Sequence, residues 1–227
     1  MGTASYPLVC NTDQVQKSYQ GDYQMAKVAL IGASGNAGSR ILKELSDRGH
    51  QVTAIARNPD KIADLPQVTA VKGDVFDKDG LAALLAGHDA VISSVHFTAS
   101  DAQTLIDAVR QSGVRRYLIV GGAGSLEVAP GQRLIDLPDF PEAYKAEASK
   151  GAEFLDLLRK EGDLEWTFLS PSAEFVPGER TGTFRLGKDT LLSNEAGSRI
   201  SFEDFAIALV DELKRPQHIR ARFTVGY

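Results

Sequence analysis

The sequence predicts one Rossmann-type α/β domain, a doubly wound parallel sheet with a small substrate-side region in the C-terminal half. From Lys27 onward, short apolar runs alternate with segments of helical periodicity, which is typical of parallel sheets with right-handed crossovers. The second observation is a glycine-rich turn at residues 32–38, between the first expected strand and the first expected helix. Rossmann domains bind the pyrophosphate of a dinucleotide at such a turn.

The first half of the chain is a regular alternation of elements. We expect strands at residues 27–31, 51–56, 68–72, 89–93 and 116–120, and helices at residues 36–48, 78–85 and 100–112. In the first helix Ile41, Leu42 and Leu45 share one face, and Gly49 follows as a stop signal. The ligand crevice should lie beyond the carboxyl ends of these strands, where the strand order reverses.

The second half is less regular. A long connection at residues 123–140 precedes a helix at 141–160, a strand at 164–169 and a turn-rich segment at 171–182. A small hairpin is expected at 183–186 and 190–192, then a capping box at 201–204 opening a helix to Leu213, and a strand at 221–225. Long connections in compact domains are often functional, so we expect the acceptor region mainly within residues 123–200.

Composition limits the classes of partner. The chain has 227 residues and a net charge of −5, which disfavours a nucleic-acid partner. No apolar run approaches the roughly 20 residues of a membrane span, and the single cysteine, Cys10, fits a cytoplasmic protein. The polar residues 1–24 suggest a flexible leader or tag, so the NAD(P)-binding domain is expected at residues 25–227. The oligomeric state is left open.

The glycine-rich turn is the centre of the predicted cofactor site. Its spacing is Gly-x-x-Gly-x-x-Gly, and the site residues expected from it are Gly32, Ser34, Gly35, Asn36, Ala37 and Gly38. The glycines allow a tight turn and a close approach of the backbone to a pyrophosphate, and the following helix offers free N–H groups to that anion. The alternative is a tight strand–helix turn without a ligand.

Arg57 favours NADP(H) over NAD(H). It follows the second expected strand, and no aspartate or glutamate occurs between Arg48 and Asp60. An acidic residue there would bind the ribose of NAD, whereas a guanidinium grips the 2′-phosphate of NADP. Lys61 supplies a second cation nearby, and the alternative for Arg57 is a solvated surface residue.

Other candidates fall at the ends of expected strands. Those assigned to the cofactor are Asp74, Val75, Ser93, Ser94, Val95, Gly121 and Pro171. For each of them, ordinary strand termination is the alternative interpretation.

Near the acceptor, Ser125 and Tyr144 are the candidate catalytic residues, and Glu174 and Phe175 are candidate walls, although a core role for Phe175 is the safer interpretation. His96 is an outside candidate for proton donation. The four histidines lack metal-ligand spacing, so no metal site is expected.

At this point a family resemblance is clear. Residues 32–38, 56–59, 73–75 and 93–95 resemble the NmrA-like atypical short-chain dehydrogenase/reductases. Residues 120–126, 141–148, 170–172, 177–182 and 199–201 resemble bacterial proteins provisionally named NADH-flavin reductases, and mammalian biliverdin reductase B is a more distant likeness. The resemblance covers residues 25–227. It implies a cytoplasmic, NAD(P)H-dependent reductase of flavins, quinones or similar acceptors.

One departure from the family pattern narrows the chemistry. Typical short-chain dehydrogenases use a Tyr-x-x-x-Lys pair, but Ala148 stands four residues after Tyr144. Lys145 and Lys150 do not share the helical face of the tyrosine. Flavin reduction does not need that pair, because the cofactors supply the chemistry. A flavin or quinone reductase is therefore our first expectation, a non-catalytic NADP(H)-responsive regulator is the alternative, and the missing pair disfavours a sugar-nucleotide epimerase.

Overall fold

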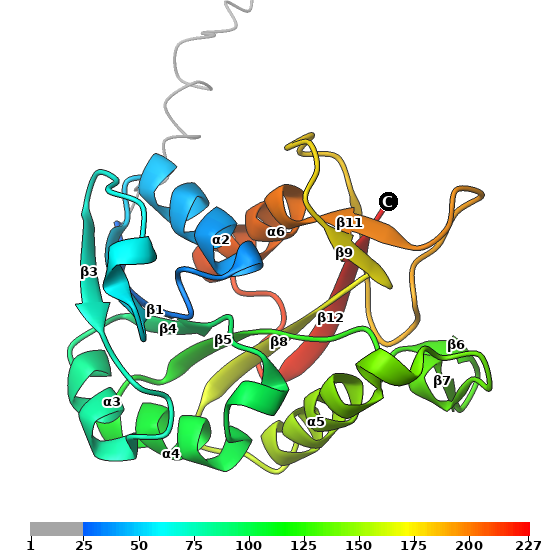
Figure 1. Cartoon of the computed structure of the whole chain (residues 1–227), viewed down its shortest axis with the longest axis horizontal. Coiled ribbons are helices and arrows are strands. Elements are labelled where there is room, and N and C mark those ends of the chain that lie inside the picture. The colour runs from blue at the N-terminus through cyan, green and yellow to red at the C-terminus, as the bar shows by residue number, and fades with distance from the viewer. Residues whose placement is uncertain (1–24) are drawn as a thin grey trace, which may run out of the picture.

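The computed structural model describes residues 25–227, so the expected leader at residues 1–24 and Cys10 lie outside the described residues. An eight-stranded sheet forms the centre, in the order β10-β12-β8-β5-β4-β1-β2-β3 (Figure 1). Its strands are β1 (Lys27–Ile31), β2 (Gln51–Ala56), β3 (Val68–Lys72), β4 (Ala90–Ser93), β5 (Arg116–Val120), β8 (Glu165–Pro171), β10 (Arg185–Gly187) and β12 (Ala221–Gly226). All neighbours in it are parallel except β10 and β12. The predicted Rossmann fold is confirmed, with the order reversing between β1 and β4.

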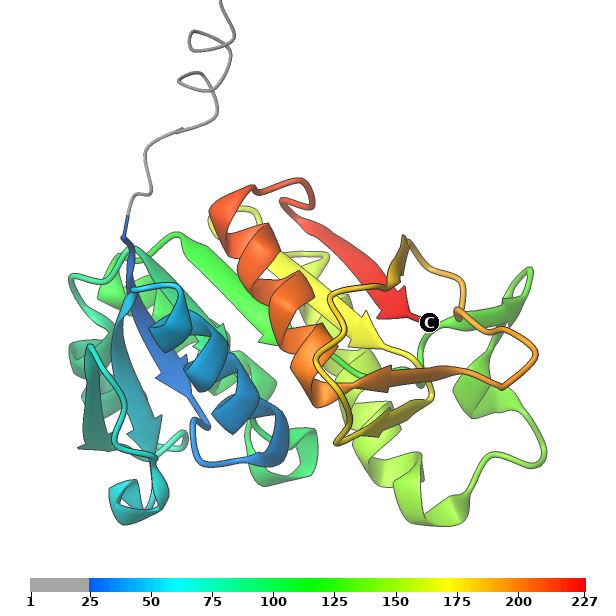
Figure 2. The ribbon, with the colours of Figure 1, turned by 90° about the horizontal axis from the view of Figure 1, so that it is seen from above.

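Helices cover both faces of the sheet (Figures 1 and 2). Helices α2 (Asn36–Asp47) and α6 (Phe202–Lys214) pack on one face, and α3 (Lys78–Leu85), α4 (Ala102–Ser112) and α5 (Glu142–Leu158) cover the other. Strand β1 shows why two cores form. Ala29 and Ile31 join the core under α3, α4 and α5, whereas Val28 and Leu30 join the core under α2 and α6. Such two-faced burial is typical of parallel strands.

Local signals set most of the element ends. Helix α2 ends just before Gly49, which has a φ of +77°. Asp101 caps α4 by accepting the amide of Thr104 at 2.7 Å, which places the start of that helix two residues later than expected. At α6 half of the expected capping box forms, since Ser201 Oγ accepts the amide of Asp204 at 3.0 Å while the carboxylate of Asp204 turns elsewhere.

The expected hairpin at 183–186 and 190–192 is wrong. Strand β10 pairs antiparallel with β12, and Leu186 is opposite Val225. The residues after it bind the long connection instead, because Glu127 donates its amide to the carbonyl of Asp189 at 2.8 Å and accepts the amide of Leu191 at 2.9 Å. Gly187 would permit a hairpin turn at this position, but β10 pairs with the edge of β12 instead.

Two pairs of short strands complete the acceptor half. The long connection holds a hairpin of β6 (Glu127–Ala129) and β7 (Gln132–Arg133). The turn-rich segment holds β9 (Glu174–Val176), which pairs in parallel with β11 (Arg199–Ser201). Among the helices of residues 25–227, none is long and apolar enough to cross a membrane.

Candidate dinucleotide site and acceptor crevice

Two glycines of the β1–α2 turn are required by backbone packing. Gly32 has a φ of +82°, and a Cβ there would lie 2.1 Å from the carbonyl oxygen of Ser94. A Cβ at Gly38 would lie 2.1 Å from the carbonyl oxygen of Gly32. The amide of Gly32 donates to Ile55 at 2.9 Å, which ties the turn to β2. These glycines bring α2 tightly against β1.

Gly35 differs, because its missing side chain faces an open surface. A Cβ there would meet only the carbonyl oxygens of Gly32 at 3.3 Å and Ser94 at 3.9 Å. Gly35 is the N-cap of α2 and supplies no side-chain cap, and the amides of Asn36, Ala37 and Gly38 have no acceptor among the described residues. Free amides at a helix N-terminus fit a pyrophosphate. Ser34 and Asn36 are exposed beside them.

The end of β4 corrects one expectation. Ser93 is 2% exposed, and its hydroxyl shares a hydrogen bond of 2.9 Å with the hydroxyl of Tyr117. Burial raises the pKa of that tyrosine. The Ser93 hydroxyl therefore contacts the core and is not available to a ribose or a phosphate. Ser94 and Val95 follow at the edge of the turn, where Ser94 donates its amide to Ile31 at 2.9 Å.

The segment that follows β2 carries two exposed cations, Arg57 and Lys61. Arg57 directly follows β2, is exposed, and has no side-chain partner among residues 25–227. Lys61 lies in the short 3-10 helix Pro59–Lys61 and is exposed as well. The amide of Gly73 donates to Ala56 at 3.1 Å, so Asp74, which follows it, lies next to the end of β2. Asp74 accepts the amide of Phe76 at 3.0 Å, and Val75 packs against the core.

The ends of β5 and β8 form the other side of the crevice. Gly121 donates its amide to Leu169 at 2.8 Å, and a Cβ there would lie 2.4 Å from the ring of Phe168. Packing alone therefore explains this glycine. Pro171 is buried as the last residue of β8. Contact of either residue with a nicotinamide stays a prediction.

The two candidate catalytic residues lie in different surroundings. Ser125 Oγ accepts a hydrogen bond of 2.9 Å from Arg222, whose side chain is 4% exposed and also binds Asp189 at 2.8 Å. Tyr144 lies in the first turn of α5, is 65% exposed, and has no described side-chain partner. No described contact joins Ser125 to Tyr144. Their roles stay predictions, and Ser125 has at least a structural one.

Ala148, which stands where the lysine of a Tyr-x-x-x-Lys pair would be, packs against Gly124. A Cβ added to Gly124 would lie 2.6 Å from the Cβ of Ala148. The backbone after β5 therefore rests directly on α5 at this position. The neighbouring Glu147 was missed by the sequence analysis, because its partners lie about fifty residues away.

Glu147 holds the segment after β4 against α5. Its carboxylate accepts the amides of Phe97 at 2.7 Å and Thr98 at 2.9 Å, and the hydroxyl of Thr98 at 2.7 Å. Burial opposes its ionisation, but the hydrogen bonds from Thr98 and Phe97 hold the pKa of Glu147 below its ordinary value. His96 is 84% exposed, with Nδ1 at 3.3 Å from Glu147. The carboxylate thereby fixes the loop that borders the glycine turn.

A second tie, also missed, joins the acceptor half to the cofactor helix. The guanidinium of Arg180 binds both oxygens of Glu44 at 2.9 Å, and Arg48 binds the same carboxylate at 2.7 Å. The Glu44 side chain is only 4% exposed. Burial opposes its ionisation, but the hydrogen bonds and charges of both arginines keep the pKa of Glu44 below its ordinary value.

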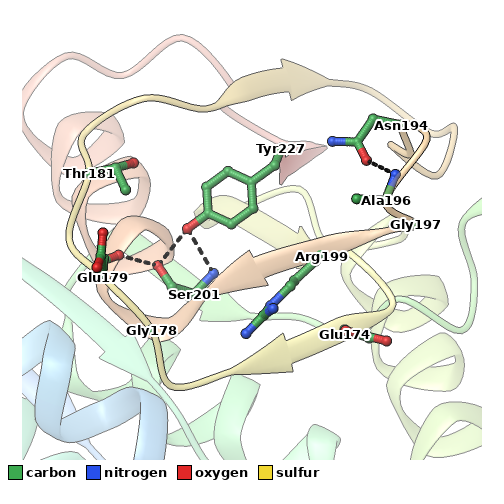
Figure 3. Close-up of a pocket in the computed structure, with 10 residues that line it drawn as sticks. All are labelled: Glu174, Gly178, Glu179, Thr181, Asn194, Ala196, Gly197, Arg199, Ser201 and Tyr227. Atoms are coloured by element: carbon green, nitrogen blue, oxygen red, sulfur yellow. Dashed lines mark hydrogen bonds between the residues drawn. The ribbon is translucent and has the colours of Figure 1, made fainter.

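Other side chains of the acceptor half are structural. Phe175 packs against the rings of Phe202 and Phe205, with centroids 4.5 and 4.7 Å away, so it belongs to the core. Trp166 is 3% exposed in β8. Glu174 stays at the surface and lines a cavity (Figure 3). Within residues 25–227 no group of histidine, cysteine, aspartate or glutamate side chains could hold a metal ion.

The reversed strand order, the glycine turn and the free amides of α2 define a dinucleotide-binding Rossmann protein. More narrowly, the chain belongs to the NAD(P)H-binding family, whose model matches residues 32–216. The resemblance to the NmrA-like atypical short-chain dehydrogenase/reductases is thereby confirmed.

Several relatives match over nearly their whole length. The uncharacterized protein YwnB of Bacillus subtilis is 43% identical, over 88% of this chain and 97% of its own. Three crystal structures carry provisional names. They are an exported protein of Burkholderia pseudomallei (46% identity, TM-score 0.81, covering 89% of this chain and 100% of that one), an epimerase of Bacteroides thetaiotaomicron (43%, 0.85, 90% and 98%), and an NADH-flavin reductase of Streptococcus pneumoniae (40%, 0.74, 88% and 99%).

Proposed function

We propose that this protein reduces a flavin, a quinone or a similar planar acceptor with NADPH. The observation that carries the proposal is Ala148, which packs against Gly124 and stands where the lysine of a Tyr-x-x-x-Lys pair would be. In such a pair the tyrosine is the acid that protonates the carbonyl oxygen, and the lysine lowers its pKa; this chain has no lysine at that position. A planar acceptor does not need that acid, because bound NADPH supplies a hydride and the reduced acceptor takes its proton from water.

The protein then has to bind NADPH and the acceptor and to orient their rings toward each other. The free amides of Asn36, Ala37 and Gly38 suit the pyrophosphate. Gly121 and Pro171, at the ends of β5 and β8, would give the nicotinamide a flat wall. Holding two rings at close range is itself a large part of such a reaction.

Arg57 supports NADPH as the preferred donor. Its guanidinium is exposed beside the end of β2 and has no partner in the described part of the chain. A free guanidinium can form a bidentate, charge-assisted pair with the 2′-phosphate. The exposed Lys61 would add to the positive potential.

The names of the similar structures refer to different activities. The Streptococcus pneumoniae structure is provisionally named an NADH-flavin reductase and the Bacteroides thetaiotaomicron structure an epimerase. The absence of a lysine four residues after Tyr144 supports the first for this chain. We further propose a small-molecule acceptor as the partner, no nucleic-acid partner, and a cytoplasmic location.

A non-catalytic, NADP(H)-responsive regulator is the second candidate. It is favoured by the same lack of a Tyr-x-x-x-Lys pair and by Tyr144, which is exposed and has no side-chain partner within residues 25–227. Both candidates need NADP(H) binding, and only the first needs turnover.

The test is anaerobic oxidation of NADPH by the purified protein, with lumiflavin, riboflavin, FMN and simple quinones as acceptors. We expect multiple turnovers with at least one of them. Tight NADPH binding without turnover of any acceptor would contradict the reductase and favour the regulator.

A further inference from the structure

A cavity of about 400 Å³ opens in the acceptor half, beyond the ends of β8 and β12 (Figure 3). Cavities of this size hold small molecules or parts of them. It is separate from the glycine turn, and residues of β9, β11 and the two loops that flank them line it. The ring of Tyr227 stands in the middle of the view in Figure 3, with Thr181 and Glu179 on one side and Asn194 on the other.

The wall of the cavity is fixed by a hydrogen-bond network. The hydroxyl of Tyr227 lies 2.8 Å from both Ser201 Oγ and Asp204 Oδ2, and it donates its single proton to one of them at a time. Ser201 Oγ donates to the carbonyl of Glu179 at 3.0 Å, and the fully buried Asp204 accepts the amide of Gly182 at 2.8 Å. The polar groups behind the wall therefore satisfy each other, and the wall is held in one shape.

The groups that face the cavity are less engaged. The carboxylates of Glu174 and Glu179 and the guanidinium of Arg199 have no side-chain partner among residues 25–227. Asn194 uses its carbonyl oxygen for the amide of Ala196 at 2.8 Å, which leaves its NH₂ group to donate. The cavity thus offers acceptors and donors together with one aromatic ring.

The cavity lining begins close in sequence to the end of β8. Glu174 begins β9 only three residues after Pro171, which ends β8. Between them Ala173 donates its amide to Ser198 Oγ at 3.0 Å, which joins this stretch to the segment before β11. An acceptor whose ring meets the nicotinamide near Pro171 would have its next atoms within reach of Glu174.

We propose that this cavity binds an uncharged, hydroxyl-rich part of the acceptor, such as the ribityl chain of riboflavin; the inference rests on the proposed function. Hydroxyl groups donate to the carboxylates of Glu174 and Glu179 and accept from Arg199 and Asn194. The C–H groups of the chain pack against the ring of Tyr227. Because two glutamates and one arginine line the cavity, it disfavours a phosphate at the end of that chain.

The experiment compares three flavins that share one ring system. Lumiflavin lacks the ribityl chain, riboflavin has it, and FMN adds a phosphate. With the wild-type protein and NADPH we expect riboflavin to exceed lumiflavin in kcat/KM by roughly tenfold, the effect of a few hydrogen bonds. FMN should fall below riboflavin. Equal values for lumiflavin and riboflavin would overturn the proposal.

Two double variants separate hydrogen bonding from charge. Glu174→Ala with Glu179→Ala should remove the advantage of riboflavin and leave lumiflavin unchanged. Glu174→Gln with Glu179→Gln should keep riboflavin and improve FMN severalfold, because amides accept hydrogen bonds without repelling a phosphate. Glu195→Gln, an exposed neighbour outside the cavity lining, is the matched control. If lumiflavin and riboflavin respond alike to the alanine variant, the cavity does not bind the chain.

Failure of the proposed function is distinguishable from failure of this inference. If neither lumiflavin nor riboflavin is reduced, the flavin reductase is wrong, and the cavity is judged by binding alone. The readout is then quenching of flavin fluorescence on titration with protein loaded with NADP⁺. Tighter binding of riboflavin than of lumiflavin, abolished by the alanine variant, supports the cavity; equal dissociation constants overturn it.

Discussion

The two halves of the molecule are built by different means. In the dinucleotide half, α2, α3 and α4 join three of the four successive strand pairs from β1 to β5, and each strand pairs with its neighbour over four or more residues. In the acceptor half, β9, β10 and β11 span three residues each. Side chains distant in sequence hold it together, such as Arg222 on Ser125 and Arg180 on Glu44. The structure of the first half therefore follows from signals close together in the sequence, whereas the structure of the second half depends on contacts with the first.

The largest effect is expected in the dinucleotide half, from Gly35→Val. Its side chain would stand where the pyrophosphate approaches, and on the protein side its Cβ would lie 3.3 Å from the carbonyl oxygen of Gly32, a close contact that a small shift of the exposed turn relieves. Binding of NADPH should weaken by roughly a hundredfold or more, measured by titration calorimetry, with little change in the unfolding temperature. Gly162→Val, where a Cβ meets nothing within 4 Å, is the control. Unchanged affinity in Gly35→Val would contradict the assignment of the cofactor site.

Arg57→Ala should weaken the discrimination between NADPH and NADH. A charge-assisted pair with a partly exposed phosphate is worth on the order of 1.5–3 kcal/mol, so the preference for NADPH should fall roughly ten- to a hundredfold. NADH binding should hardly change. Dissociation constants are compared at fixed salt, because the interaction is screened. Arg115→Ala, at the opposite end of the sheet, is the control. A wild type that binds both dinucleotides equally would refute the NADP assignment.

Glu44→Gln tests the tie between the halves. It weakens two arginine contacts of a buried carboxylate, and the free energy of unfolding should fall by about 2 kcal/mol. Because the pKa of Glu44 is lowered by folding, the ionised carboxylate stabilises the protein above its unfolded pKa, near 4.5, and this contribution is lost as the pH falls through the folded pKa. The difference between wild type and variant in urea denaturation should therefore shrink in acid.

Glu153→Gln is the matched control for this tie, since its ion pair with Lys150 is exposed and should contribute little. A difference between wild type and Glu44→Gln that stays constant from neutral to acidic pH would show that the charge of Glu44 is not what joins the halves.

The smallest effect is expected in the acceptor half, from Tyr144→Phe. The phenol is 65% exposed and has no described partner, so stability and NADPH binding should not change. Steady-state reduction of riboflavin should stay within about threefold of wild type. A loss of about a hundredfold, the scale of general-acid catalysis, would make Tyr144 a proton donor after all.

The contrast between the halves also explains what could be predicted. Strands β1, β2, β3 and β5 have the expected bounds, because apolar runs ended by glycine or turn residues are local signals. The glycine turn and the exposed place of Arg57 followed from the same pattern.

The hairpin around Gly187 failed because the partner of β10 lies about forty residues away. Glu44 and Glu147 were missed for the same reason, since a carboxylate within a helix looks like a solvated residue until its distant partner is known.

The position of β12 has a consequence for the order in which the protein folds. This strand lies between β8 and β10, both of which are synthesised before it. Strands β1 to β5, which are neighbours in the sheet, can assemble while the ribosome is still making the acceptor half. Strand β10, by contrast, has no sheet partner until residues 221–226 emerge. A nascent chain thus carries an unpaired strand during the last stage of its synthesis, and in refolding the amides of residues 185–187 should gain protection from hydrogen exchange last.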